Sequence, residues 1–332
     1  MYDKIQKINY ICILYCHKAR TVSHLGEIIS LLVAVSWTFS AWFADKASRS
    51  IGSMVTNVIR LVLATLFLGL TLWVTIGSPW PVYADSKAWL WLAASALVGY
   101  VFGDFCLFNC YLSIGPRFGQ LLMTLAPPMA AVAGWAILGE SLSWKAGLAM
   151  AVTLAGIAIS ILSRGKDHHL QLSLPFKGIL LGIGAGIGQG VGLVLSKVGM
   201  QHYADAVPAG APAIIGTMMP FASTMIRAIV GAAGFIFLLA LQRGLGGLRD
   251  AARDPSGMRY AVLLTIFGPV LGVSLSLMAV QYADAAIAST LMALTPVFIL
   301  LPEALINKKK IKPREILGVL VSIAGVAMFF LL

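Results

Sequence analysis

The chain has 332 residues, of which 59% are hydrophobic and only 11% are charged. Soluble domains carry about 25% charged residues, so this composition excludes an ordinary soluble domain and indicates a chain embedded in a lipid bilayer. The formal net charge of +11 does not indicate nucleic-acid binding, because the basic residues lie in loops between apolar runs, where positive charge sets orientation in a membrane.

Residues 1–23 do not match the rest of the chain and form an N-terminal extension. Their apolar part is short, lysines flank it on both sides, and no small-residue cleavage site follows, so they make a poor signal peptide. Cys12 and Cys16 lie four residues apart here, but the other ligands of a metal site are missing. The segment is a tail, an interfacial segment or an over-extended start of translation.

Ten apolar runs follow, each close to the roughly 20 residues that a helix needs to cross a bilayer. Because the runs are continuous and do not alternate, they predict helices and not the strands of a barrel. We therefore expect an all-α, multi-pass protein of the plasma (inner) membrane with ten transmembrane helices. The runs cover residues 25–44, 52–76, 88–110, 118–138, 144–163, 175–195, 214–241, 260–280, 284–306 and 315–332.

The sequence contains an internal repeat. A shift of 169 positions places residues 99–158 on 268–327 with 13 identities over 60 positions and no gap. The chain thus divides into a first repeat at 24–163, a linker at 164–174 and a second repeat at 175–332. Since five helices is an odd number, the second repeat enters the membrane from the opposite side. Inverted repeats of this kind are typical of secondary transporters, whose substrate site lies at the repeat interface near the bilayer midplane.

Prolines occur at matching places in the fourth and ninth runs. Pro127 and Pro128 lie in the first repeat, and Pro296 lies 169 positions after Pro127. A proline inside a helix frees a backbone carbonyl and bends the axis, and in lipid that carbonyl must find protein or water. The three prolines predict helices that bend around a shared central space; a plain tolerated kink is the alternative.

The chain resembles the drug/metabolite transporter superfamily, specifically a protein with two EamA-type repeats. The resemblance rests on an arginine in the second helix of each repeat (Arg60 and Arg227), on the pattern "GD...GPR...LLMTLAPP...LGE" from Gly103 to Glu140, and on the fifth-helix sequences "GLAMAVTLAGIAI" and "GVLVSIAGVAM". It implies ten helices, no ATP, and export or exchange of small metabolites. One departure is clear, since Lys309 stands in the second repeat where Glu140 ends the fourth helix of the first.

Few charged residues lie within the apolar runs, where each costs about 2.5–3.5 kcal/mol by insertion scales. Asp104 is the deepest acid, and it either binds a cationic substrate or coupling proton or serves as the structural partner of an arginine. Arg60 and Arg227 either hold a carboxylate or phosphate through a bidentate fork or form ion pairs between helices. Their presence in both repeats favours the structural role.

Several uncharged polar or aromatic side chains also lie within the runs. Aromatic walls can hold rings or organic cations, although ordinary packing is the more frequent role of any one such residue. If Gly26 is set on Gly178, the first and sixth helices align and two of these residues share one position. The candidates for facing a cavity are Ser36, Trp37, Asn109, Gln120 and Gln189, of which Trp37 and Gln189 are the aligned pair.

These features predict a secondary active transporter, an exporter of amino acids, drug-like compounds or related solutes, that works by alternating access. We expect a small-molecule substrate, a proton or another coupling ion, the lipid bilayer as environment, no nucleic acid and no cofactor. A non-transporting receptor or scaffold is the alternative. An intramembrane enzyme is disfavoured because all five histidines lie outside or at the edges of the runs, so no Ser-His pair or metal cluster is available at depth.

The orientation in the membrane is left open by two conflicting signals. Outside the helices, the side with both termini carries 7 Lys and Arg residues and the other side carries 15. The positive-inside rule therefore places the termini outside, whereas the resemblance implies cytoplasmic termini.

Overall fold

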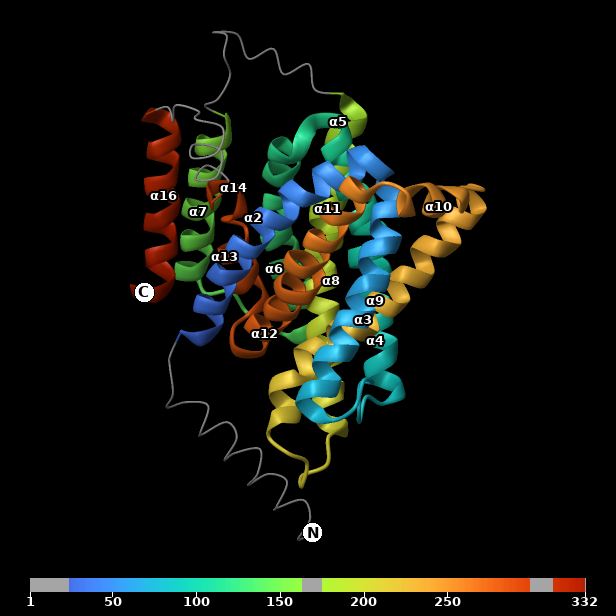
Figure 1. Cartoon of the computed structure of the whole chain (residues 1–332). Helices are drawn as coiled ribbons and strands as arrows, with labels where there is room; N and C mark the ends of the chain where they lie inside the picture. Colours follow the sequence, from blue (N-terminus) through green and yellow to red (C-terminus); the bar gives the residue numbers. More distant parts are fainter. Residues whose placement is uncertain (1–23, 163–174, 299–312, 332) are drawn as a thin grey trace.

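The computed structural model describes residues 24–162, 175–298 and 313–331, and within these ranges the chain is helical, with no strand (Figure 1). The N-terminal extension, the linker at 164–174 and residues 299–306 of the run at 284–306 lie outside the described residues. Lys309, which replaces Glu140 in the second repeat, lies outside them too.

The first repeat contains five helical stretches, two of which change helix type along their length. The elements are α2 (Leu25–Ile51), α3 (Ser53–Ile76), α4 (Ser86–Ala96), the π-helix η1 (Leu97–Asp104), α5 (Phe105–Leu122), the 3-10 turn η2 (Met123–Leu125), α6 (Ala126–Leu138) and α7 (Trp144–Leu162). Gly115, with a φ of 82°, interrupts α5, and Pro116 follows it. Only glycine adopts this left-handed conformation without strain.

The second repeat follows the same order with one addition, the short helix α10 between its second and third stretches. The elements are α8 (Phe176–Ala206), α9 (Ile214–Leu241), α10 (Gly246–Ala252), α11 (Pro255–Thr265), the π-helix η3 (Ile266–Val273), α12 (Ser274–Tyr282), α13 (Ala285–Met292), α14 (Thr295–Phe298) and α16 (Pro313–Leu331).

Seven helices in the described part of the chain are long and apolar enough to cross a membrane. Shorter apolar helices accompany them at Trp144–Ile159, Ala285–Phe298 and Ile316–Phe330. Large apolar side chains such as Leu66, Trp73, Val74 and Trp135 are more than half exposed on the outer surface, as expected where lipid replaces water. The prediction of an all-helical integral membrane protein is therefore confirmed.

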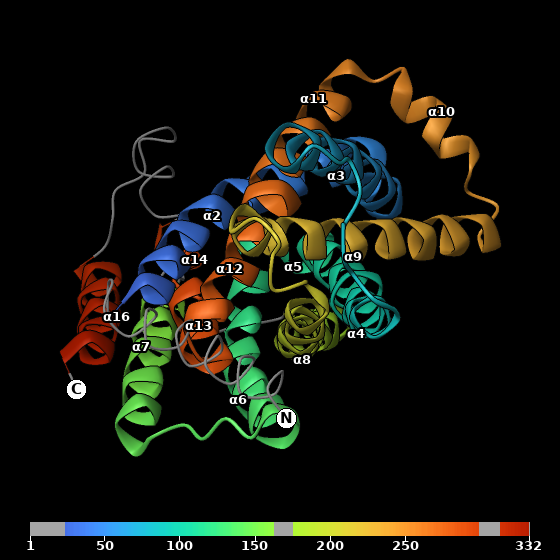
Figure 2. The same cartoon turned by 90° about the horizontal axis from the view of Figure 1, so that it is seen from below.

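The contacts between helices remain equivalent when the two repeats are exchanged. The first helix of repeat one, α2, packs on α11, η3, α12 and α13 of repeat two, and the first helix of repeat two, α8, packs on α4, η1, α5 and α6 of repeat one. Two equivalent pairs face each other directly, α3 with α9 and α7 with α16. The α7–α16 pair lies along one side of the bundle in both views (Figures 1 and 2). This reciprocity is what a two-fold relationship between the repeats produces.

The irregular segments obey the same relationship. The π-helices at Leu97–Asp104 and Ile266–Val273 are 169 positions apart, which is the shift that aligns the repeats. The helix restarts at Ala126 in α6 and at Thr295 in α14 are separated by the same number. π-Helices are rare and are frequently found at functional sites. The matched irregularities therefore belong to the repeat unit and are not local accidents.

The prolines stand where a helix restarts, and not within an unbroken helix. Pro127 and Pro128 lie in the first turn of α6, directly after η2, and Pro296 is the second residue of α14. The first amides of a helix have no intrahelical acceptor, so the missing N–H of proline costs nothing there. The sequence predicts that each proline frees a carbonyl inside a continuous helix. The structure instead has an irregular segment just before each proline, at equivalent places in the two repeats.

Candidate functional site

A cavity of about 100 Å³ lies where the two repeats meet. Because about 10–15 Å³ of such volume holds one water molecule, the cavity has room for a small solute. Equivalent positions of both repeats line it. The cavity therefore lies at the interface between the repeats, where their two-fold relationship brings matching residues together. The pairs are Asp104 with Val273, Leu107 with Ser276, Gln120 with Ser289, Met123 with Met292, Ala126 with Thr295, Trp37 with Gln189, Ala41 with Leu193, and Arg60 with Arg227.

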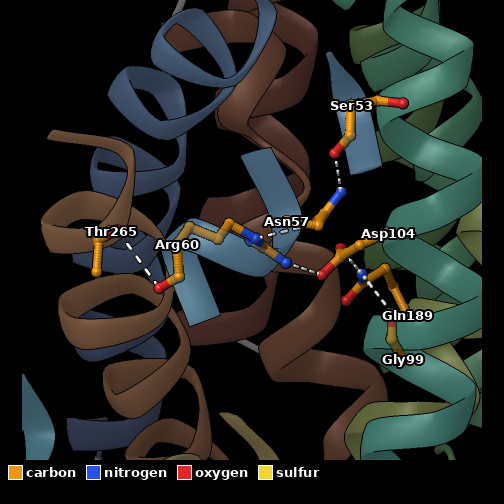
Figure 3. Close-up of polar contacts among 7 residues, drawn as sticks. All are labelled: Ser53, Asn57, Arg60, Gly99, Asp104, Gln189 and Thr265. Carbon is orange, nitrogen blue, oxygen red and sulfur yellow. Dashed lines mark hydrogen bonds and ion pairs between the residues drawn. The ribbon is translucent and has the colours of Figure 1, made fainter. Parts of the chain in front are cut away.

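A buried ion pair forms one wall of the cavity (Figure 3). Arg60 from α3 donates through Nη2 to Oδ2 of Asp104, at the end of η1, and the two side chains are only 5% and 6% exposed. Nε of Arg60 also donates to Oδ1 of Asn57 over 2.9 Å. The pair is neutral as a whole, and each partner supplies the counter-charge that the other needs away from water.

Gln189 joins this pair from the other repeat. Its Nε2 donates to Oδ1 of Asp104 over 2.7 Å and lies 3.2 Å from the carbonyl oxygen of Gly99 (Figure 3). Both carboxylate oxygens of Asp104 therefore accept a hydrogen bond, one from each repeat. The structure thus brings Arg60, Asp104 and Gln189 together. A coupling or cation-binding role for Asp104 remains a prediction.

Arg227, the counterpart of Arg60, has a different environment. It is 3% exposed and lines the cavity, yet its Nε has no hydrogen-bond partner. Among the described residues, no carboxylate lies within ion-pair distance of it. Its guanidinium lies over the ring of Tyr100, with Cζ 4.5 Å from the ring centroid, while Cζ of Arg60 lies 5.6 Å from the same centroid. Both arginines thus contact the same ring, and the hydroxyl of Tyr100 is also without a partner.

Glycines let the first helix of each repeat approach the π-helix of the other. A Cβ atom on Gly272 would lie 2.6 Å from Cδ1 of Trp37, and one on Gly103 would lie 3.4 Å from Nε2 of Gln189. These are equivalent contacts, because Trp37 and Gln189 align, as do Gly103 and Gly272. Small residues at such crossings allow close backbone packing in a membrane, and here they set the cavity walls.

Comparison with known proteins identifies the family. The model of the EamA-like transporter family matches the chain twice, at residues 24–162 and 176–331. The chain belongs to the EamA-like transporter family. The family is one of transporters, which is consistent with the expectation that the chain is not an enzyme. None of the curated proteins compared with it matches.

A solved crystal structure of a protein is similar to this EamA-like transporter in fold. The two share 17% sequence identity with a TM-score of 0.64, and the match covers 94% of this chain and 97% of the other. At this level of identity the likeness concerns the arrangement of helices alone. It extends over nearly the whole EamA-like chain and so includes both repeats.

Other predicted site residues of the EamA-like transporter lie in varied places. Trp37 and Gln120 line the cavity, and Gln120 donates through Nε2 to the hydroxyl of Tyr111. Asn109 is not among the lining residues; its Nδ2 donates to the carbonyl of Phe105 over 2.7 Å, and its Oδ1 accepts from Ser53 over 3.2 Å. A role for Asn109 at the cavity stays a prediction; in the structure its side chain bonds within its helix and to α3.

The prolines themselves do not line the cavity, but the residues beside them do. Met123 and Ala126 come just before Pro127, and Met292 and Thr295 come just before Pro296. The helix breaks of both repeats therefore border the central space.

Sequence reasoning missed several residues of the site, above all Tyr100. The signal for it was present, since Tyr100 lies between two glycines, Gly99 and Gly103, that recur in the second repeat. Ser276 and Ser289 were missed because isolated serines in apolar runs are common. They become visible once the shift of 169 is applied to Leu107 and Gln120.

A second group of charges lies at one end of the bundle. Nζ of Lys197 in α8 lies 2.5 Å from Oε1 of Glu140 and donates to the carbonyl of Ala283 over 2.9 Å. Oε2 of Glu140 accepts from the backbone N–H of Ala285 over 3.1 Å. Gly139, with a φ of 68°, ends α6 and turns Glu140 toward this group. The contacts join α6, α8 and the turn between α12 and α13. We call Glu140, Lys197 and Asp284 the end cluster.

Proposed function

We propose that the chain is a secondary active transporter, an exporter of small organic metabolites, that works by alternating access between two inverted five-helix repeats. The observation that carries the proposal is the cavity lined by equivalent positions of both repeats. Secondary transporters built from inverted repeats bind their substrate at such an interface. The membership in the EamA-like transporter family supports the same class.

In the proposal, ten membrane crossings produce the inverted arrangement. The seven long helices and the three shorter apolar ones fall on the ten apolar runs of the sequence. Five crossings in each repeat reverse the direction of the second repeat. The direct contacts of α3 with α9 and of α7 with α16 fit a two-fold axis in the membrane plane.

Alternating access requires joints and closing contacts, and candidates for both are present. The backbone is irregular at Gly115, at η2 and at the start of α14, so helical segments on either side can tilt separately. The end cluster ties α6, α8 and the α12–α13 turn together at one end of the bundle. In the proposal, these contacts form when that end is closed and separate when it opens.

The driving force is an ion gradient or solute exchange, in the plasma (inner) membrane. Asp104 is the candidate proton carrier because it is the one acid among the described residues that line the cavity. Its bond to Arg60 would have to loosen when a proton binds. Protonation would thereby couple to the contact between α3 and η1.

The test is transport by the purified full chain in proteoliposomes. A strain that overexpresses the chain is first screened for resistance to toxic metabolites, and the solute found is then labelled. We expect saturable flux that Ser276→Phe, which fills the cavity, removes. Leu66→Phe, at a position 61% exposed on the outer surface, serves as the matched control and leaves flux unchanged. Absence of flux for every solute that confers resistance would contradict the proposal and favour a receptor or scaffold.

A further inference from the structure

The charges that line the cavity do not balance. Arg60 and Asp104 neutralise each other, and Arg227 is the remaining charged side chain among the described residues that line the space. The cavity therefore carries one net positive charge. A buried cation without a counter-charge is strongly unfavourable, so an anion is the natural occupant of the space beside Arg227.

The imbalance arises from one difference between the repeats. Asp104 neutralises Arg60 within the first repeat. The position equivalent to Asp104 in the second repeat is Val273, which also lines the cavity. Where the repeat would place the acid for Arg227, the chain has an apolar side chain. The acid that Arg227 lacks is thus absent from the sequence position that would supply it.

The geometry of Arg227 suits recognition of a planar anion. Nε has no partner in the described structure, and a Cβ on Gly99 would lie 3.0 Å from Nη2, so the absence of a side chain at Gly99 makes room for the guanidinium. The centroid of the Tyr100 ring lies 4.5 Å from Cζ, so the ring covers one face of the guanidinium. The planar fork of arginine matches a carboxylate with two parallel hydrogen bonds. The hydroxyl of Tyr100 is likewise buried without a partner beside this wall.

We propose that Arg227 binds the carboxylate of the substrate, and that the transported solute is a small organic acid with a single carboxylate. This inference rests on the proposed transport function. One net positive charge matches a carboxylate, whereas a phosphate monoester carries about −1.5 to −2 at pH 7 and would leave the cavity negative. A cation is disfavoured, because Arg227 repels it and Asp104 already accepts from Arg60 and Gln189. Trp37, Leu193 and the two methionines form apolar walls for the body of the solute.

The test uses acids and their uncharged amides as matched probes. Thermal unfolding of the full chain in detergent is followed with benzoate and benzamide, with propionate and propionamide, and with benzylamine as a cation. We expect at least one acid to stabilise the protein while its amide and benzylamine do not. Arg227→Gln should weaken the binding of that acid by roughly 10- to 100-fold, as the loss of charged hydrogen bonds does, and Arg227→Lys by less. Arg49→Gln, on a 54% exposed arginine paired with Asp45, is the matched control and leaves binding unchanged.

A second variant keeps the test decisive if Arg227→Gln does not fold. Val273→Asp restores the acid that the first repeat has at Asp104, so we expect a folded protein that no longer binds the acids. Acid binding by Val273→Asp equal to that of the unmodified chain would overturn the proposal. So would equal or tighter binding of an amide or of benzylamine, or the failure of every acid at millimolar concentration.

The same probes in proteoliposomes separate this inference from transport itself. If the chain binds acids through Arg227 but shows no flux, the anion site is supported and the transport function is contradicted. If the chain transports a solute and Arg227→Gln leaves that flux unchanged, the transport function is supported and the anion site is contradicted.

Discussion

Gln189 of the second repeat donates a hydrogen bond of 2.7 Å to the carboxylate of Asp104 in the first repeat. A hydrogen bond to a charged group contributes about 1.5–3 kcal/mol, and leaving a buried acceptor without its donor costs a similar amount. We therefore predict that Gln189→Leu lowers the free energy of unfolding by about 1–3 kcal/mol. Thermal and denaturant unfolding in detergent measure the change. An unaltered stability would show that this contact does not hold the repeats together.

The Arg60–Asp104 pair gives a second prediction. Asp104→Asn leaves the Arg60 guanidinium buried without a counter-charge, and removing one partner of a buried pair costs about 3–5 kcal/mol. Replacing both partners with leucine should restore much of that stability, because no charge is then left unpaired. Unfolding of the single and double variants tests this.

Transport separates the structural role of Asp104 from a role in coupling. If Asp104→Asn is as stable as the unmodified chain but shows no proton-driven flux, the acid acts in coupling. If the single variant loses stability and the double-leucine variant regains both stability and flux, the pair is structural. Unchanged flux at all pH values in Asp104→Asn would remove this residue from the mechanism.

The fold could be predicted because the internal repeat is detectable in the sequence even though the whole chain is apolar. Leucine matches are expected by chance in an apolar chain, but the matches of Gly99, Gly103 and Pro127 to residues 169 positions later are not. The π-helices and helix breaks occur at those positions. Their presence could not be predicted, because a π-turn depends on the packing of the opposite repeat against the glycines.

The site was only partly predictable, because partner choice is a tertiary property. Arg60 and Arg227 are equivalent in sequence, and one acid was available at depth. Only the structure shows that Asp104 contacts Arg60. The surroundings of Asn109 could not be predicted, because a polar residue in an apolar run can satisfy its hydrogen bonds within its own helix or across to a neighbour as well as in a cavity.

The glycine contacts at the cavity wall predict a graded response to alanine. A Cβ on Gly272 would lie 2.6 Å from Trp37 and 2.7 Å from the carbonyl oxygen of Phe267, whereas one on Gly216 would have nothing within 4 Å. Gly272→Ala must displace the indole and the backbone, so we expect a loss of about 1–3 kcal/mol, as in overpacked cores. Gly216→Ala should be neutral or stabilising by up to about 1 kcal/mol. Equal melting temperatures for the two variants would contradict the close approach of α2 to η3.

The end cluster predicts a change in access to the cavity. Lys197→Gln removes the charge that holds Glu140, and Glu140→Gln removes the acceptor for Lys197. If the contacts close one end, either variant should label faster with a water-soluble maleimide at Ser289→Cys. If either variant destabilises the closed end by about 1–2 kcal/mol, the labelling rate should rise roughly 5- to 30-fold. Lys145→Gln, an exposed lysine five residues from Glu140, is the matched control. Equal labelling in all backgrounds would show that the end cluster is no gate.

Asp284, beside Lys197 and Glu140, gives a prediction for pH. Partial burial raises the pKa of this carboxyl, and the charge of Glu140 raises it further, although Lys197 opposes both effects. The folded state therefore binds more protons than the unfolded state between the ordinary aspartate pKa of about 3.9 and the raised value. Stability should fall as pH rises through that window. Because the side chain remains exposed, the effect should be small.

Asp254 provides the opposite sign on the same molecule. Its carboxylate accepts hydrogen bonds from Ser50 and from the backbone N–H of Gly257, which lower its pKa, so the stability that it contributes is lost as pH falls through the lowered value. Unfolding measured between pH 3 and 8 compares Asp284→Asn with Asp254→Asn. Asp284→Asn should raise stability most at the upper end of the range, because it removes a charge that the folded state disfavours. Asp254→Asn should lower stability at that end and converge with the unmodified chain at low pH. Parallel pH curves for the two variants would mean that neither carboxyl changes its proton affinity on folding.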